Sequence, residues 1–295
     1  MTSAWQNYHA PRTVDDAIEL LQRYGGGARV IGGGTDFLVE TRRGLHRPNA
    51  AIIDATRIAN LDAISEEGGY VLIGCGVTLS QIIRDKRILA NGTCLAESCG
   101  VIGGPQVRNV GTLAGNVAHA LPAGDGTIGL LALGGEIEIA SAEGTRWIPA
   151  AESFVGPGRS AIDRHNEVLT RLRFRPTLEK EGSAHHRVMR PQGLCLPIIS
   201  MAARVRLDAD DNVEAVTISM GPVGPVPWVA EPAMEVLRGA PATAAQFDKA
   251  AEAIIAEVTL RTSKYRATSE YRQTMIRTYL PIILARAVER AGGAT

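Results

Sequence analysis

Residues 103–125 read G-G-P-Q-V-R-N-V-G-T-L-A-G-N-V-A-H-A-L-P-A-G-D. This segment is rich in glycine and shows almost no helical or strand periodicity. A segment of this length without a period is too apolar in composition for a disordered linker. Glycine lets a backbone approach a ligand closely, and Thr112, Asn116 and Asp125 add short polar side chains. We therefore interpret residues 103–125 as a backbone cradle for a phosphate-bearing cofactor.

A second glycine segment lies earlier in the chain, where G-G-G-T-D-F (residues 32–37) follows the short apolar stretch A-R-V-I (residues 28–31). A Rossmann fingerprint would need a third glycine where Phe37 stands, and a Walker A loop would need a lysine directly after a glycine, which the sequence lacks. Taken alone, residues 32–37 fit a structural tight turn as well as they fit a phosphate-binding loop. Two such segments in adjacent units favour backbone N–H groups gathered around a diphosphate.

Two aspartates accompany these segments. Asp36 and Asp125 would repel a diphosphate, so they fit better as acceptors for ribose or ribityl hydroxyls, or as caps of their own loops.

Composition limits the class of protein. The chain has 295 residues, of which 45% are hydrophobic and 21% charged, and its net charge is zero. These values indicate a soluble globular protein of about two domains and argue against a nucleic-acid surface. The N-terminus lacks a signal-peptide pattern, and no apolar run reaches the roughly 18 residues of a membrane helix, so we expect a cytoplasmic protein without a membrane span. The cysteines are scattered, which favours buried thiols over a metal site.

Local patterns predict alternating helices and strands. We expect strands over 28–31, 50–53, 70–75, 136–140, 146–148, 168–174, 197–207 and 213–220, with 136–148 forming a hairpin. We expect helices over 11–24 (N-cap Thr13 or Asp15), from Thr78, over 89–99, 127–133 and 231–237, after a capping box at Thr243 and Gln246, and over 269–291. The polar interval 176–183 is the clearest domain boundary.

The two glycine segments, with S-E-Y-R at residues 269–272, resemble the FAD-binding medium subunit of the molybdenum hydroxylases, which include relatives of xanthine dehydrogenase and aerobic carbon monoxide dehydrogenase. The resemblance covers essentially the whole chain. It implies an α+β fold: a two-subdomain FAD-binding fold of the vanillyl-alcohol-oxidase (PCMH) type plus a C-terminal α/β sandwich-like domain. The implied units are FAD-binding subdomain 1 (1–57), FAD-binding subdomain 2 (58–177) and a C-terminal domain of the carbon monoxide dehydrogenase flavoprotein type (182–291).

The resemblance also implies a set of residues around FAD. One side of the diphosphate would be contacted by Gly32, Gly33, Gly34 and Thr35, flanked by Val30, Ile31, Asp36 and Phe37. The other side would be contacted by Thr112, Leu113, Ala114, Gly115 and Asn116. Asp125 matches an acidic residue on the flavin side, Leu169 an apolar contact, Ile102 a position near the ring, and Arg187 a position where relatives usually carry lysine.

The sequence departs from the family pattern at two places. Ala114 replaces the first of two paired glycines, which implies a slightly looser backbone approach. His185-His186-Arg187 replaces the more usual aromatic-x-Lys arrangement, so His186 is a candidate to stack on the flavin or is an ordinary core or surface histidine. Some relatives hold an iron–sulfur cluster in a cysteine-bearing insertion, and because that insertion is absent here we expect no cluster in this chain.

The activity implied by the resemblance is that of an oxidoreductase subunit. A small partner subunit with two [2Fe–2S] clusters would pass electrons to non-covalent FAD on this chain, and a large partner would carry the molybdenum cofactor, usually in a dimer of heterotrimers. The electrons would leave to NAD+, a quinone, oxygen or another carrier. Two alternatives remain open: a free-standing flavin oxidase or reductase of the same superfamily, and a binding module that has lost its flavin.

Overall fold

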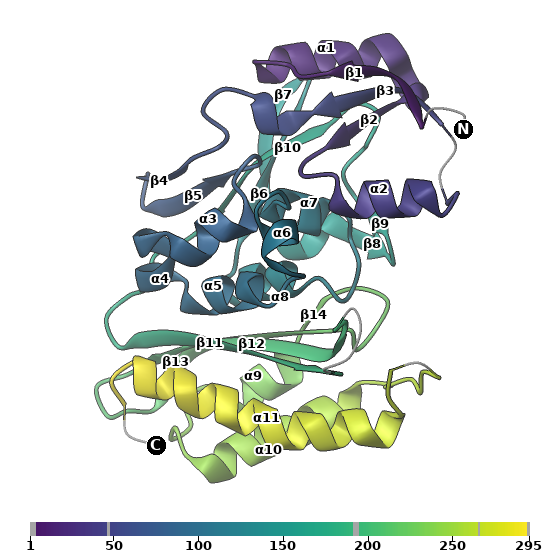
Figure 1. The fold of residues 1–295 in the computed structure, drawn as a ribbon. Helices are drawn as coiled ribbons and strands as arrows, with labels where there is room; N and C mark the ends of the chain where they lie inside the picture. The colour runs from purple at the N-terminus through teal and green to yellow at the C-terminus, as the bar shows by residue number, and fades with distance from the viewer. Residues whose placement is uncertain (1–3, 46–47, 191–194, 265, 294–295) are drawn as a thin grey trace.

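The computed structural model describes residues 4–45, 48–190, 195–264 and 266–293. Three larger sheets with associated helices follow one another along the chain, and the long final helix lies at the opposite end of the molecule from the first (Figure 1). Among the described residues, no helix is both long enough and apolar enough to cross a membrane.

The N-terminal unit is a three-stranded parallel sheet in the order β1-β3-β2. Its elements are β1 (Trp5–His9), α1 (Val14–Tyr24), β2 (Ala28–Ile31), α2 (Thr35–Arg42) and β3 (Asn49–Asp54). Thr13 is the N-cap of α1, and Gly25, with a positive φ of 50°, ends that helix. Of the two N-caps expected from the sequence, Thr13 is therefore the one used.

The second unit is a five-stranded antiparallel sheet in the order β4-β5-β10-β6-β7. Its strands are β4 (Ile64–Glu67), β5 (Tyr70–Gly74), β6 (Glu136–Ser141), β7 (Gly144–Pro149) and β10 (Val168–Phe174). Its helices are α3 (Leu79–Arg84), α4 (Lys86–Asn91), α5 (Thr93–Gly100), α6 (Pro105–Arg108), α7 (Leu113–Ala118) and α8 (Asp125–Ala132), and β8 (Phe154–Gly156) pairs with β9 (Arg159–Ser160).

The third unit is a four-stranded antiparallel sheet in the order β11-β12-β13-β14, with three helices. The strands are β11 (Glu181–Met189), β12 (Pro197–Leu207), β13 (Val213–Gly221) and β14 (Trp228–Val229), and the helices are α9 (Glu231–Leu237), α10 (Ala244–Glu257) and α11 (Ser269–Arg290). One face of this sheet is covered by α9 and α11, while α5 and α8 of the second unit pack against the other face (Figure 1). The sheet therefore forms the layer between the two ends of the molecule.

The apolar side chains divide into two buried clusters. One cluster joins the first and second units and includes Leu21, Ile53, Leu113 and Leu169. The other lies between the third sheet and its helices. Ala202 on β12 belongs to the first cluster, whereas its neighbours Met201 and Ala203 belong to the second, because successive strand residues face opposite sides.

Several expectations from the sequence are wrong in detail. Residues 103–125 are not free of regular structure, because they contain the short helices α6 and α7 and the first residue of α8. The single helix expected over 89–99 is two helices separated at Gly92, where a side chain would lie 2.8 Å from the Phe174 ring. Thr243 is the N-cap of α10, but its side chain makes no capping bond, so the expected capping box is absent.

The sequence analysis also misses seven elements outside those segments. These are β1, α2, β4, β8, β9, β11 and β14, and β11 begins at Glu181, inside the polar interval 176–183.

Candidate functional site

The two glycine segments touch each other directly. A methyl group at Gly33 would lie 1.8 Å from the carbonyl oxygen of Val110 and 2.8 Å from the Cα atom of Gly111. Real side-chain carbons do not approach backbone atoms this closely, so only glycine fits at position 33 without separating the segments. Residues about eighty positions apart in the chain are therefore in backbone contact.

Thr112 holds the second segment in place beside the first. Its hydroxyl accepts a hydrogen bond from the Gly115 N–H (3.0 Å) and caps α7, and a methyl group at Gly32 would lie 2.5 Å from that same hydroxyl. The N–H of Leu79, at the start of α3, donates to the Gly111 carbonyl (2.9 Å). Thr112 thus serves both as a helix cap and as the wall against which Gly32 packs.

Both glycine segments lead into the N-terminus of a helix. α2 begins directly after Gly34, which has the left-handed φ of 65° that favours glycine, and α7 begins directly after Thr112. The first N–H groups of a helix have no acceptor within that helix, and the helix dipole makes this end partially positive. Two such ends beside one contact provide backbone donors suited to an anion such as a diphosphate.

A side-chain contact also connects α2 with the end of α7. His119, which follows α7, lies with Nε2 3.4 Å from Oε1 of Glu40 on α2. The two helices are therefore joined at a second point beyond the glycine contact.

The cradle continues from α7 to the N-terminus of α8. Oδ1 of Asn116 accepts hydrogen bonds from the backbone N–H (3.0 Å) and the hydroxyl (3.2 Å) of Thr127, and so ties α7 to the first turn of α8. A methyl group at Gly126 would lie 3.4 Å from the Ile102 side chain. The arginine of the segment, Arg108, donates to the carbonyls of Ile102 (3.1 Å) and Gly103 (2.7 Å) and so holds that turn.

Asp125, the first residue of α8, forms a buried ion pair with Arg187 on β11. Oδ2 of Asp125 lies 3.0 Å from Nη1 of Arg187, and the two side chains are 4% and 8% exposed. Burial raises the pKa of the Asp125 carboxyl group, while the Arg187 charge acts in the opposite direction. This ion pair links the second unit to the third sheet.

His185 lies on the same face of β11 as Arg187. Its Nε2 is 2.8 Å from the Ser200 hydroxyl on β12 and 3.9 Å from Oδ1 of Asp125. Burial lowers the pKa of His185 to about 3, so its ring is neutral at physiological pH. His186 faces the other side of the sheet and stacks on Tyr279 of α11, with ring centroids 4.3 Å apart, so the structure places it away from Asp125.

The remaining expected residues lie around this cradle. Val30 and Ile31 end β2, while Asp36 is exposed and Phe37 is buried in the first turn of α2. The Arg29 guanidinium lies 5.4 Å from the centroid of the Phe37 ring. Leu169 is buried on β10, which packs against α7.

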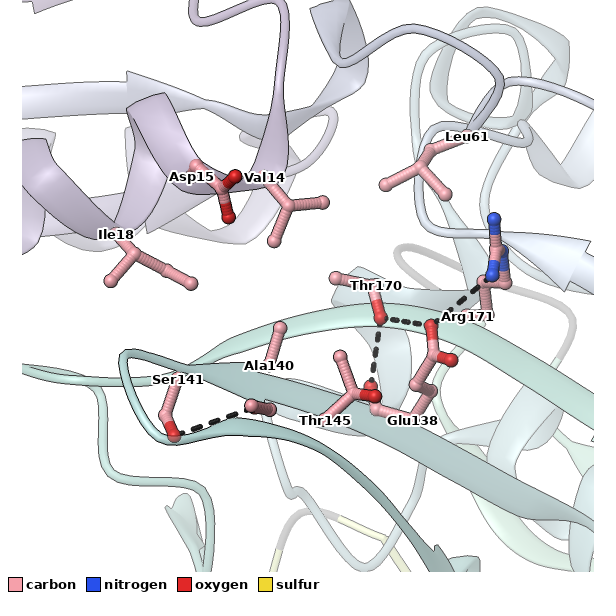
Figure 2. A pocket seen from close by; sticks show the side chains of 11 residues that line it. Val14, Asp15, Ile18, Leu61, Glu138, Ala140, Ser141, Thr145, Thr170 and Arg171 are labelled. Carbon is pink, nitrogen blue, oxygen red and sulfur yellow. Dashed lines mark hydrogen bonds and ion pairs between the residues drawn. The ribbon is translucent and has the colours of Figure 1, made fainter.

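A separate pocket of about 290 Å³ lies between α1 and the second sheet (Figure 2). Glu138 of β6 lines it and accepts a hydrogen bond from the Thr170 hydroxyl (2.6 Å). The pocket contains none of the residues expected around the cofactor. It opens on the other face of the sheet from Leu169, because Leu169 pairs with Ile139 and Ile139 points away from its neighbour Glu138.

The sequence analysis misses four residues that shape the site. Val110 and Gly111 contribute backbone only, Thr127 is the partner of Asn116, and Ser200 is a buried serine in an apolar strand. Val110 and Gly111 lie within the glycine segment, which is the signal that points to them. No local pattern points to Ser200, because only the sheet brings it beside His185.

Comparison with known proteins identifies similar sequences along almost the whole chain. Residues 3–176 match the family model described as "FAD binding domain in molybdopterin dehydrogenase", and residues 184–287 match the "CO dehydrogenase flavoprotein C-terminal domain". The chain is 31% identical to the xanthine dehydrogenase FAD-binding subunit of Escherichia coli O157:H7, over 97% of each chain. It is 32% identical to the carbon monoxide dehydrogenase medium chain of Afipia carboxidovorans, covering 97% of this chain and 96% of the relative.

Two solved structures share the fold of this chain over almost its whole length. The structure of carbon monoxide dehydrogenase from Hydrogenophaga pseudoflava, in a form lacking the Mo-pyranopterin moiety of its cofactor, superposes with a TM-score of 0.91 at 27% identity. The match covers 98% of this chain and 99% of the other. A structure of the cyanide-inactivated Cu,Mo-CO dehydrogenase gives a TM-score of 0.90 at 28% identity, covering 98% of this chain and 100% of the other.

Proposed function

Because this chain belongs to the family of FAD-binding domains of molybdopterin dehydrogenases, we propose that it is the FAD-carrying electron-transfer subunit of a molybdenum-containing hydroxylase or dehydrogenase. Its mixed helix and sheet fold is proposed to be of the vanillyl-alcohol-oxidase (PCMH) type, with a C-terminal α/β sandwich-like domain. The proposed domain boundaries are 1–57, 58–177 and 182–291. A cytoplasmic location is part of the same proposal.

The contact between Gly33 and the Val110–Gly111 backbone is the observation that carries this proposal. A dinucleotide cofactor needs backbone donors on two sides of its diphosphate, and this contact brings the N-termini of α2 and α7 together. Each hydrogen bond to a charged group contributes about 1.5–3 kcal/mol, so a few such donors hold a dinucleotide firmly. The residues present therefore fit FAD.

The chain's own residues would bind and orient the cofactor. Residues 32–35 and 112–116 would hold the diphosphate, with the hydroxyls of Thr35 and Thr112 as additional donors, and Val30, Ile31, Asp36 and Phe37 would flank it. Ile102, Asp125 and Arg187 would lie at the flavin end, and Leu169 would contribute an apolar contact.

A bound flavin would supply the redox chemistry, while this chain would supply binding, orientation and electrostatics. This chain then needs no acid, base or nucleophile of its own, because its task is to hold the ring in place. The matched relatives are described as an FAD-binding subunit and a medium chain. We propose partners to match: a small subunit with [2Fe–2S] clusters that donates electrons and a large subunit with the molybdenum cofactor, assembled as a dimer of heterotrimers.

The test is flavin binding followed by electron transfer. The purified chain should bind one FAD per chain in a fluorescence titration. The FAD absorbance should then bleach when the loaded chain is mixed anaerobically with its reduced iron–sulfur partner. A chain that binds no FAD would refute the cofactor assignment, and a loaded chain that oxidises an organic substrate without partners would favour a free-standing flavoenzyme.

A further inference from the structure

The Asp125 carboxylate is buried with only one of its two oxygens hydrogen-bonded. Oδ2 accepts from Arg187, whereas Oδ1 is inaccessible to solvent and has no hydrogen-bond partner of ordinary geometry among the described residues. Leaving a buried acceptor unpaired costs about 1–3 kcal/mol, and more when it is charged. An arrangement that supplies a donor to Oδ1 is therefore strongly favoured.

Two groups from the third sheet lie next to this oxygen. His185 Nε2 is 3.9 Å from Oδ1, and burial raises the pKa of the Asp125 carboxyl group while the Ser200 hydroxyl opposes that rise. Ser200 is completely buried and lies 2.8 Å from His185 Nε2. A hydroxyl has one proton, so Ser200 donates either to His185 or to Asp125, but not to both.

The tautomer of His185 decides between these two arrangements. If Nε2 carries no proton, Ser200 must donate to His185 and Asp125 Oδ1 stays unpaired. If Nε2 carries the proton, His185 donates to Ser200 and frees the serine proton for Oδ1. Only the second arrangement gives Asp125 Oδ1 a donor, and it requires the proton of the neutral His185 ring to be on Nε2.

We propose that His185 and Ser200 are positioning residues for Asp125: His185 Nε2–H donates to the Ser200 oxygen, and the Ser200 hydroxyl donates to Asp125 Oδ1. The relay holds the carboxylate as an anion in one orientation, with its other oxygen on Arg187. This inference rests on the proposed function, because it takes Asp125 to lie at the flavin end of the cofactor site. The residues of the third sheet thereby control how the cofactor is held by the second unit.

Within the part of the chain that the structure describes, the side chains that face Asp125 come from β11, β12 and α5. β11 contributes Arg187 and His185, and β12 contributes Ser200. α5 contributes Cys99, whose pKa is raised by burial, so the thiol stays protonated. Protonation of Asp125 itself is therefore the titration that the relay controls, and loss of the Ser200 bond raises the pKa of this carboxyl group further.

The experiment measures the FAD dissociation constant of the full chain by fluorescence titration between about pH 5 and pH 8. Ser200→Ala should weaken FAD binding by about 10-fold near neutral pH, since a hydrogen bond to a charged group is lost. It should also move the acid-side loss of affinity to higher pH, because Asp125 accepts a proton more readily. His185→Gln keeps an N–H donor and should retain the wild-type profile, whereas His185→Leu should behave like Ser200→Ala.

Ser219→Ala is the matched control. Ser219 is an equally buried serine of the same sheet, and its hydroxyl donates to the Ile128 carbonyl of α8 (2.6 Å) without touching Asp125. It should lower stability without changing the pH profile of FAD binding. The inference is wrong if Ser200→Ala and His185→Leu keep the wild-type profile, or if Ser219→Ala shifts it equally. Failure of the wild-type chain to bind FAD would instead overturn the proposed function.

Discussion

Gly33 shows how strongly a single position can be constrained by a distant backbone. Its neighbours in the sequence impose no such limit, since the φ of Gly33 is not in the left-handed region. The limit comes from the Val110 carbonyl oxygen, 1.8 Å from the place where a side-chain carbon would stand. A substitution at position 33 must therefore move one glycine segment away from the other.

We predict that Gly33→Ala weakens FAD binding by at least about 10-fold, because displaced N–H groups lose hydrogen bonds to a charged group. Fluorescence titration with FAD is the measurement. Gly100→Ala is the control, since a methyl group there would meet nothing within 4 Å. Equal FAD affinity in the two variants would show that the contact does not shape the cofactor site.

The Asp125–Arg187 pair gives a second prediction at this scale. Arg187→Met should lower the free energy of unfolding by about 3–5 kcal/mol, because it leaves a buried carboxylate without its cation. Arg206→Met removes the partly exposed partner of Glu214 and should cost less than about 1 kcal/mol. Urea unfolding of both variants measures the difference. Similar losses would mean that breaking the Asp125–Arg187 pair costs no more than breaking a solvent-accessible ion pair.

His185 makes stability depend on pH. Burial lowers the pKa of His185 in the folded chain to about 3 from its ordinary value of 6.5, so over this range the unfolded chain binds a proton that the folded chain does not bind. The stability that the neutral His185 ring contributes to the fold is therefore fully present above pH 6.5. It declines as the pH falls toward 3, by about 1.4 kcal/mol per pH unit. His185→Gln should unfold with a shallower acid dependence in this window, measured by urea titration at several pH values. If the stability of the wild type and of His185→Gln changed with pH in parallel, this pH dependence could not be assigned to His185.

At the scale of elements, two threonine N-caps differ in a way that the sequence does not reveal. Thr13 accepts from the Asp16 N–H (3.1 Å), and its own N–H donates to the Asp16 carboxylate (3.2 Å), which completes a capping box on α1. Thr243 occupies the same position on α10 without a side-chain capping bond. An identical residue at an identical helix position therefore has a different role.

We predict that Thr13→Ala lowers the free energy of unfolding by about 0.5–2 kcal/mol, the usual value of an N-cap. Thr243→Ala should cost clearly less, since no capping bond is lost. Thermal or urea unfolding of the two variants measures the two losses. A larger loss for Thr243→Ala would contradict the conclusion that only Thr13 makes a capping bond.

Local signals predict some elements and miss others for identifiable reasons. β2 and β10 have the same ends in sequence and structure, because each is an apolar or alternating run between turn residues. β1 is missed because three of its five residues are exposed and polar or aromatic in no clear alternation. β11 is missed because it buries Ser183 and His185, whose polar groups are satisfied only by other elements.

At the scale of the whole molecule, two apolar clusters are joined by polar contacts. Glu97 of α5 binds Arg290 of α11 (2.5 Å) and accepts the His185 N–H (2.8 Å). Arg204 of β12 donates to the Leu133 carbonyl after α8 (3.3 Å). These contacts hold the third sheet against the second unit, so a cofactor bound beside Asp125 would be enclosed by both.

FAD should therefore stabilise the molecule as a whole. At about 100 times its dissociation constant, a ligand that binds only the folded chain adds about 2.7 kcal/mol. We expect FAD to raise the melting temperature of the wild-type chain in differential scanning fluorimetry. At the same concentration it should raise that of Gly33→Ala much less. An unchanged wild-type melting temperature on adding FAD would contradict the cofactor assignment.

The sequence by itself determined the family, the cofactor class and most elements with strong local patterns, because glycine runs, helix caps and apolar alternation act over a few residues. Only the tertiary structure decided that Gly33 lies against Val110, that Ser200 stands behind His185, and that His186 packs on Tyr279 instead. Each of these depends on which segments the sheets bring together. Steric exclusion and the pairing of buried polar groups act between residues far apart in the chain, and no local pattern records them.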